Sequence, residues 1–311
     1  MKLTAAFLRM IRLPNLLFIA LTQLLFQFCI YTPLYKGQIP ESDFTRFILI
    51  VLASLLIAAA GYIINDYFDI DIDEVNKPER VIVDRIISRR WAIAWHFMLS
   101  MAGIIFTLFA LPVFQFPHLV LANIFCVILL WFYSTNYKKT LIIGNVVISL
   151  LTAWTVLIIF FSKFPLAASI KGEEQHIDPK FFRLSFLYAG FAFIISIIRE
   201  AIKDMEDLPG DTKGGCKTMP VVWGLTATKV YVAVWLIVLT ASIAAIQVYI
   251  IQFGWWWPLL YCIFLIIGPL TFIFYKLFKA QTSLHFRTLS GMTKLVMLTG
   301  TLSMIFFYFY L

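Results

Sequence analysis

The chain has 311 residues, of which 61% are hydrophobic, 17% aromatic and only 14% charged. A soluble globular domain has an apolar share of about one half, so this composition excludes an ordinary soluble fold. The formal net charge of +8 is carried by no soluble basic domain, so we expect no nucleic-acid partner. Basic residues next to a membrane are attracted to lipid headgroups instead.

Nine apolar runs follow one another along the chain, and each is close to the roughly 20 residues that a helix needs to cross a bilayer. They cover residues 7–30, 45–65, 91–112, 117–133, 141–162, 182–202, 227–251, 255–278 and 290–310. The sequence therefore predicts an all-α, polytopic membrane protein with about nine transmembrane helices. We expect residues 1–311 to form a single transmembrane domain.

The polar segments between these runs differ in charge. Most of the 25 Lys and Arg residues fall on one side of the predicted membrane, and cytoplasmic loops are the ones enriched in Lys and Arg. This pattern predicts a cytoplasmic N-terminus, an external C-terminus, and two long cytoplasmic loops at residues 66–90 and 203–226.

The first of these loops begins with an acidic cluster directly after the second apolar run. The polar residues in it are Asn65, Asp66, Asp69, Asp71 and Asp73. Asn65, Asp69 and Asp73 lie at helical spacing, so they can share one face. Like charges so close together repel unless a cation bridges them. Magnesium fits, since it takes oxygen ligands and is usually held by one or two carboxylates together with substrate phosphates.

A second cluster follows the sixth apolar run, with Glu200, Asp204, Glu206, Asp207 and Asp211. The spacing is again helical, up to Pro209 and Gly210, where we expect the helix to break. A solvated, acidic helix end explains one such cluster equally well, but two clusters at matching depth favour one magnesium–diphosphate site. Its predicted metal-binding and catalytic residues are Asp66, Asp69, Asp73, Asp204, Asp207 and Asp211. Predicted cationic partners of the diphosphate are Arg80, Lys138, Lys203, Lys213 and Lys217.

Two segments also carry motifs. The first reads Asn65-Asp66-Tyr67-Phe68-Asp69-Ile70-Asp71-Ile72-Asp73 and continues to Asn76, Lys77, Pro78 and Arg80. The second reads Arg199-Glu200-Ala201-Ile202-Lys203-Asp204-Met205-Glu206-Asp207 and continues to Gly210-Asp211 and Lys217-Thr218-Met219-Pro220. Shorter matches are Arg12-Leu13-Pro14-Asn15, Tyr133-Ser134 with Lys138, and Gly144-Asn145. In this order and spacing, the chain resembles the UbiA superfamily of intramembrane prenyltransferases, whose first signature is NDxxDxxxD.

This resemblance implies helices around a central cavity with a cytoplasmic cap, and Mg2+-dependent transfer of an isoprenyl group from a prenyl diphosphate to a lipophilic acceptor. Asn65, Arg80, Lys138 and Lys203 would bind the diphosphate. Asn15 or Tyr133 would orient the acceptor, and Arg12 or Arg199 would bind a phosphate on it. The chain departs from the family at Val81–Arg85, which replaces a Pro-Ile-Pro-x-Gly-like turn, so the cap loop is expected to differ in shape.

The acceptor has two candidate classes. The second signature is most similar to the branch that prenylates geranylgeranylglyceryl phosphate for ether-lipid synthesis, and the alternative is an aromatic acceptor such as 4-hydroxybenzoate or dihydroxynaphthoate. A more distant alternative is an ion-coupled transporter, since intramembrane carboxylates also mark ion paths. A transporter predicts acidic residues at mid-helix, whereas these lie at predicted helix ends.

Overall fold

The computed structural model describes residues 2–76, 81–165 and 177–311. These residues are almost entirely helical, and the only extended pairing among them is an isolated bridge between Val83 and Ile87. Within the described ranges, nine helices are long and apolar enough to cross a membrane, which confirms the predicted number. They span Leu13–Leu34, Asp43–Phe68, Arg89–Ala110, Pro117–Thr135, Ile143–Phe161, Pro179–Lys213, Gly224–Ile251, Trp256–Lys279 and Ser283–Tyr310.

The chain divides into two compact units, each interrupted in sequence. The first unit comprises Met1–Tyr137 and Trp154–Ala189, and the second comprises Lys138–Ala153 and Gly190–Leu311. The first acidic cluster belongs to the first unit and the second acidic cluster to the second unit.

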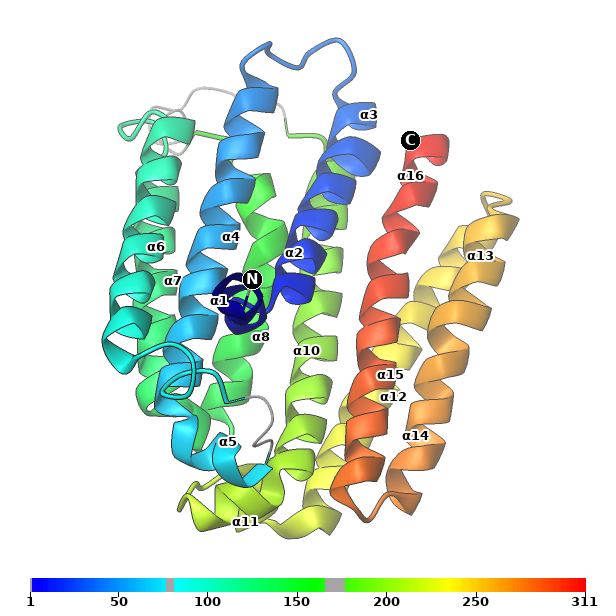
Figure 1. Ribbon diagram of the computed structural model, residues 1–311. Coiled ribbons are helices and arrows are strands. Elements are labelled where there is room, and N and C mark those ends of the chain that lie inside the picture. The colour runs from blue at the N-terminus through cyan, green and yellow to red at the C-terminus, as the bar shows by residue number, and fades with distance from the viewer. Residues whose placement is uncertain (1, 77–80, 166–176) are drawn as a thin grey trace. The chain divides into compact units, whose positions relative to one another are not determined.

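In the first unit, helix α4 (Asp43–Phe68) packs against α6 (Arg89–Ala110), α7 (Pro117–Thr135) and α2 (Leu13–Leu25), as the ribbon shows (Figure 1). The contact between α4 and α6 is close because Gly103 has no side chain. A Cβ atom placed there would lie 2.6 Å from the side chain of Ile57. Small residues that let helix backbones approach are typical of membrane helix interfaces. This packing fixes α4, whose last turn carries the first acidic cluster.

A layer of apolar residues surrounds the end of α4 that carries this cluster. Helix α1 (Lys2–Met10) contributes Ala6 and Met10, and the segment that follows α5 (Ile70–Asn76) contributes Val83 and Ile87. The tip of that segment is Asp84, which has a left-handed backbone (φ 73°) and donates its N–H to the carbonyl of Ile87 at 2.8 Å. The departure from the family pattern thus gives a short turn in which Val81, Ile82, Val83 and Ile87 are buried and Ile86 is exposed.

The opposite end of α4 holds a buried ion pair. Lys163 Nζ lies 2.7 Å from Oδ1 of Asp43, and Gln27 donates to Oδ2 of the same carboxylate at 2.8 Å. The Lys163 ammonium also lies 4.2 Å from the centre of the Tyr31 ring, a cation–π contact. Gln27 and Tyr31 both belong to a π-helical segment, η1 (Phe26–Tyr31). Burial lowers the pKa of Lys163, and the Asp43 carboxylate opposes that shift.

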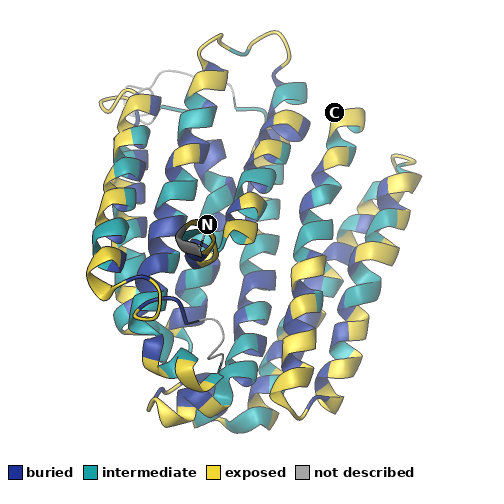
Figure 2. Cartoon of the chain, viewed as in Figure 1, coloured by how far each residue is buried: buried dark blue, intermediate teal, exposed yellow. Residues whose placement is uncertain are grey.

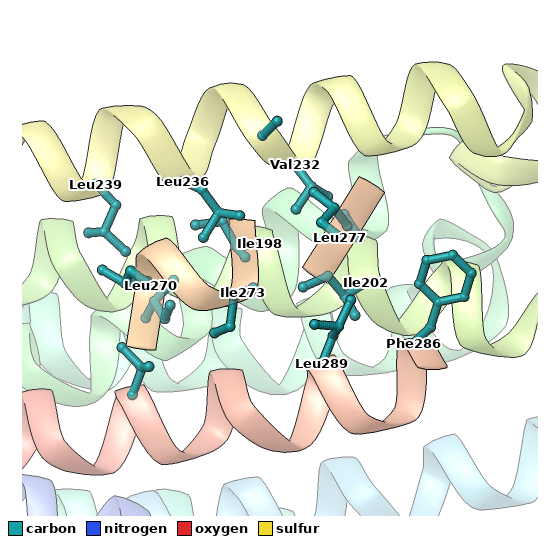
Figure 3. Close-up of a cluster of buried hydrophobic side chains, with 14 of the residues drawn as sticks. Ile198, Ile202, Val232, Leu236, Leu239, Leu270, Ile273, Leu277, Phe286 and Leu289 are labelled. Atoms are coloured by element: carbon teal, nitrogen blue, oxygen red, sulfur yellow. The ribbon is translucent and has the colours of Figure 1, made fainter. Parts of the chain in front are cut away.

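The second unit is built around an aliphatic core between α10 (Pro179–Lys213), α12 (Gly224–Ile251), α14 (Gly268–Lys279) and α15 (Ser283–Leu302). The close-up shows side chains from all four helices in one cluster (Figure 3). Among its fully buried members are Ile198, Val232, Leu270 and Ile273. Many residues on other faces of these helices are exposed apolar side chains (Figure 2), as expected for surfaces that contact lipid.

The predicted helix break at Pro209 and Gly210 is wrong, because α10 continues through Pro209 to Lys213. Proline in a helix removes one backbone hydrogen bond, but contacts of the following loop stabilise the last turn. The N–H of Gly214 donates to the backbone carbonyl of Gly210 at 2.7 Å, and the N–H of Cys216 donates to the backbone carbonyl of Asp211 at 2.9 Å. The helix instead ends before Gly215, whose φ of 67° is left-handed, as is common just past a helix C-terminus.

Candidate active site

In the first cluster, Asp66 is paired with an arginine from the start of α2. Arg12 Nη2 lies 2.7 Å from Asp66 Oδ1, and the guanidinium lies 5.1 Å from the centre of the Tyr62 ring. Burial alone would lower the pKa of Arg12, but the charge of Asp66 raises it, and the net shift is upward. Arg12 was predicted to bind a phosphate on the acceptor, and the structure places it against a predicted metal ligand.

The backbone at Arg12 is unusual, with φ 51° and ψ 55°. A residue with a side chain pays roughly 1–2 kcal/mol to adopt this left-handed conformation. Such strained residues are concentrated at functional sites, where the surroundings hold them in place. The tight turn between α1 and α2 is what brings the guanidinium to Asp66.

Asn65 and Asp69 form a second contact in this cluster. Asn65 Nδ2 donates to Asp69 Oδ2 at 2.6 Å, as expected from their spacing of four residues. The helical spacing of Asn65, Asp69 and Asp73 spans a helix end, because α4 ends at Phe68 and α5 begins at Ile70. The N–H of Asp73 still donates to the carbonyl of Asp69 at 2.8 Å, which keeps the two residues adjacent.

In the second cluster, Asp204 is bound by an amide from another helix. Asn145, near the start of α8 (Ile143–Phe161), donates its Nδ2 to Asp204 Oδ2 at 2.9 Å. Asn145 is buried, with 6% of its surface exposed. The Asn145 amide, which is neutral, thus holds one carboxylate oxygen of Asp204. Asp66, by contrast, is held by the positively charged Arg12.

Two of the predicted cations of α10, Arg199 and Lys203, contact Glu200. Arg199 Nη1 donates to Glu200 Oε1, and Lys203 Nζ lies 3.9 Å from Glu200 Oε2. Glu200 is buried, and a buried carboxylate requires such partners. Glu200 is therefore the counter-ion of Arg199 and Lys203, which are both predicted to bind substrate.

Asp211 is held by the segment that follows α10. Thr218, the residue before α11 (Met219–Val222), donates its hydroxyl to Asp211 Oδ2 at 3.0 Å. One residue earlier, the N–H of Lys217 donates to the carbonyl of Lys139 at 2.8 Å. This bond brings the turn η3 (Tyr137–Lys139), which includes the predicted diphosphate ligand Lys138, next to the end of the second cluster.

The predicted site residues thus have different outcomes. Asp207 and Asp73 are half-buried on α10 and α5, and Tyr133 lies on α7. Asn15 lies in the first turn of α2, where its N–H donates to the carbonyl of Arg12 at 2.8 Å. Arg80 lies outside the described residues.

The oxygen-rich donor set of the first cluster fits a hard divalent cation such as magnesium. Asn65 Oδ1 is buried and has no hydrogen-bond partner among the described residues, so it is an acceptor suited to a cation or to bound water. In the part of the chain that the structure describes, no group of three or more His, Cys, Asp and Glu side chains is arranged to hold a metal by itself. Magnesium held partly by substrate phosphates does not need such a group.

Three residues of the site had no role assigned from sequence. In the sequence, Asn145 belongs only to the short match Gly144-Asn145. The sequence predicts no contact of Thr218 or Glu200 with another site residue. The contact of Asn145 with Asp204 joins positions 59 residues apart, and no periodicity along a single helix indicates it. Thr218 precedes α11, but its side chain makes no capping hydrogen bond and donates to Asp211 instead, so a capping preference does not indicate its contact.

The fold and these clusters define a class of protein, an integral multi-pass membrane protein with one acidic cluster at the end of α4 and another along the C-terminal part of α10. Residues 28–293 match the UbiA prenyltransferase family. The chain belongs to this family.

Two curated relatives are named digeranylgeranylglyceryl phosphate synthase. The one from Hyperthermus butylicus is 33% identical over 235 residues, which are 75% of this chain and 73% of the relative. The one from Methanospirillum hungatei is 34% identical over 201 residues, 63% of this chain and 62% of the relative. The chain therefore matches slightly less than two thirds of that relative's length.

Solved structures show the same fold. A structure described as digeranylgeranylglyceryl phosphate synthase in membranes has a TM-score of 0.65 at 20% identity and covers all of both chains. A UbiA homolog from Archaeoglobus fulgidus bound to GPP and Mg2+ has a TM-score of 0.58 at 17% identity, with 96% of this chain and 99% of that chain covered.

Proposed function

We propose that this protein is a Mg2+-dependent prenyltransferase that joins the prenyl group of a prenyl diphosphate to geranylgeranylglyceryl phosphate. The observation that carries the proposal is the pair of acidic clusters, in which Arg12, Asn65, Asn145 and Thr218 hold four of the aspartates, Asp66, Asp69, Asp204 and Asp211. The names of the curated relatives, and the GPP and Mg2+ bound to a structural neighbour, support it.

In the proposed reaction, the acceptor hydroxyl oxygen attacks the first carbon of the prenyl group while the bond from that carbon to the diphosphate oxygen breaks. The hydroxyl proton passes to a base. Mg2+ would supply neutralisation of the leaving diphosphate. Its ligands in the proposal are the aspartates listed by cluster: Asp66, Asp69 and Asp73 in the first, and Asp204, Asp207 and Asp211 in the second.

Cationic side chains would share the charge that develops on the leaving group. We assign this role to Arg80, Lys138 and Lys203, with Asn65 as a further diphosphate ligand. The apolar helices would keep water from the first carbon of the prenyl group as positive charge develops on it. Lys203 already contacts Glu200 at 3.9 Å, so the diphosphate would compete with Glu200 for its ammonium group.

The acceptor phosphate would need a cation of its own, and we assign Arg199, with Arg12 as the second candidate. A planar guanidinium can bind a phosphate with two parallel hydrogen bonds. Asn15 or Tyr133 would orient the acceptor. An aromatic acceptor, 4-hydroxybenzoate or dihydroxynaphthoate, would instead be alkylated on a ring carbon and would need no such phosphate-binding cation.

We further propose that the two units act as one domain in the lipid bilayer, with the active site and a cap on the cytoplasmic side. The excess of Lys and Arg in the loops that contain both clusters supports this orientation. A membrane interior also suits a donor and an acceptor that both carry long apolar chains.

The experiment that tests the function uses the purified full-length protein with labelled geranylgeranyl diphosphate. Geranylgeranylglyceryl phosphate, 4-hydroxybenzoate and dihydroxynaphthoate are supplied in separate reactions, each with Mg2+ or with excess EDTA. We expect product only with the glyceryl phosphate and only with Mg2+. Product with an aromatic acceptor alone would overturn the acceptor, and transfer that survives EDTA would overturn the metal role.

A further inference from the structure

A polar seam connects α8 and α10 within the second unit. Asn145 contacts Asp204, the Ser149 hydroxyl donates to the carbonyl of Asn145 at 2.7 Å, and the hydroxyls of Thr152 and Ser196 lie 3.3 Å apart. The three residues of α8 are spaced by four and three positions, so they lie on one face of the helix. The seam has Asp204 at one end.

Asn145 is held by hydrogen bonds at both its backbone carbonyl and its side-chain amide. The backbone carbonyl of Asn145 accepts a hydrogen bond from Ser149, which is fully buried. Asn145 itself is only 6% exposed. A buried amide that lost its hydrogen bond would cost about 1–3 kcal/mol. The geometry therefore holds Asn145 and the carboxylate of Asp204 in one arrangement before any ligand binds.

We infer that Asn145 is a positioning residue, which orients the carboxylate of Asp204 for Mg2+ binding without neutralising it. The inference rests on the proposed function, in which Asp204 is a metal ligand. A cation in this position would compete with Mg2+ for the charge of Asp204, whereas an amide only fixes the direction of the carboxylate. Partners that hold metal ligands in this way typically contribute 10–100-fold to metal affinity or activity.

Variants of three positions separate this role from simple helix packing. Asn145→Leu and Asn145→Asp have side chains of similar size and no amide donor. Thr152→Val is the matched control, because it removes the hydroxyl that faces Ser196 on the same side of α8. Asp204→Ala serves as the reference that removes the ligand itself.

The measurement is calorimetric titration of Mg2+ into the detergent-solubilised full-length chain in the presence of inorganic pyrophosphate, alongside the Mg2+ dependence of transfer. We expect both Asn145 variants to bind Mg2+ about 10–100-fold more weakly, with the KM for Mg2+ raised in proportion. At saturating Mg2+, kcat should largely recover. Thr152→Val should bind Mg2+ as the parent protein does.

The outcomes distinguish the inference from the function on which it rests. If Asp204→Ala leaves Mg2+ binding unchanged, the proposed metal role of Asp204 fails, and the inference fails with it. If Asp204→Ala weakens binding and the folded Asn145 variants do not, the inference alone is overturned. If both Asn145 variants fail to fold in detergent, Asn145 is a structural residue, and the inference is also overturned.

Discussion

The guanidinium of Arg12 and the carboxylate of Asp66, 54 positions apart in the chain, form an ion pair of 2.7 Å in the first unit. Arg12, whose backbone is left-handed, thus places its positive charge beside Asp66, a residue proposed to bind Mg2+. The strained backbone of Arg12 does not by itself stabilise the protein. What the strained turn maintains is the position of the Arg12 guanidinium.

Arg12 therefore offers a test that separates charge from strain. We predict that Arg12→Ala and Arg12→Gly both reduce transfer, because each removes the guanidinium that holds Asp66 in place and that is the second candidate to bind the acceptor phosphate. Arg12→Gly should be the more stable of the two by roughly 1–2 kcal/mol, since glycine adopts this backbone freely. Thermal unfolding in detergent and transfer rates check this, and equal stability of the two variants would contradict the assignment of strain.

The carboxylates should differ in importance according to their place in the site. We predict that Asp69→Ala or Asp204→Ala abolishes transfer while the protein stays folded, because each removes a proposed metal ligand. Asp71 is exposed on α5, and Asp71→Ala is the matched control that should retain transfer. Near-normal turnover in both ligand variants would refute a metal site that uses the two clusters.

The Asp43–Lys163 pair should matter for stability and not for chemistry. The two side chains are only 10% and 5% exposed, so Lys163→Met leaves a buried carboxylate unpaired and should destabilise the protein by about 3–5 kcal/mol. The double variant Lys163→Met/Asp43→Asn should regain much of this loss. Denaturation of the single and double variants checks it, and an additive loss would show that the two residues do not interact.

Arg199 tests the identity of the acceptor. We predict that Arg199→Ala raises the KM for geranylgeranylglyceryl phosphate far more than the KM for the prenyl diphosphate, with Arg199→Lys in between because lysine keeps the charge and loses the planar fork. Steady-state kinetics with each substrate varied in turn provide the measurement. An equal rise in both KM values would mean that Arg199 acts mainly through Glu200, which it contacts.

The orientation in the membrane can be tested with single cysteines. We predict that a cysteine at Lys217, which is exposed between α10 and α11, reacts with an impermeant reagent from the cytoplasmic side. A cysteine at Lys36, which is exposed after α3 (Thr32–Leu34), should react from the outside. The opposite labelling pattern would reverse the proposed topology.

The sequence predicted those features that depend on local spacing. Apolar runs of membrane length gave the nine spans, and a separation of four residues placed Asn65 against Asp69. The partners of Asp66 and Asp204 could not be predicted in this way, because they come from other helices. The end of α10 was mispredicted for a related reason, since contacts of Asp211 with the following loop outweigh the local effect of Pro209.

The Asp43–Lys163 ion pair also constrains how the protein is made. Asp43 and Lys163 are 120 positions apart, and at the usual rates of synthesis Lys163 is added roughly 6–24 s after Asp43. Until then, the Asp43 carboxylate lacks its cation, so it must remain at a hydrated position or bind a proton while α4 enters the bilayer. Co-translational insertion of α4 and closure of the first unit are therefore separate events, and the second waits for the end of α8 to emerge from the ribosome.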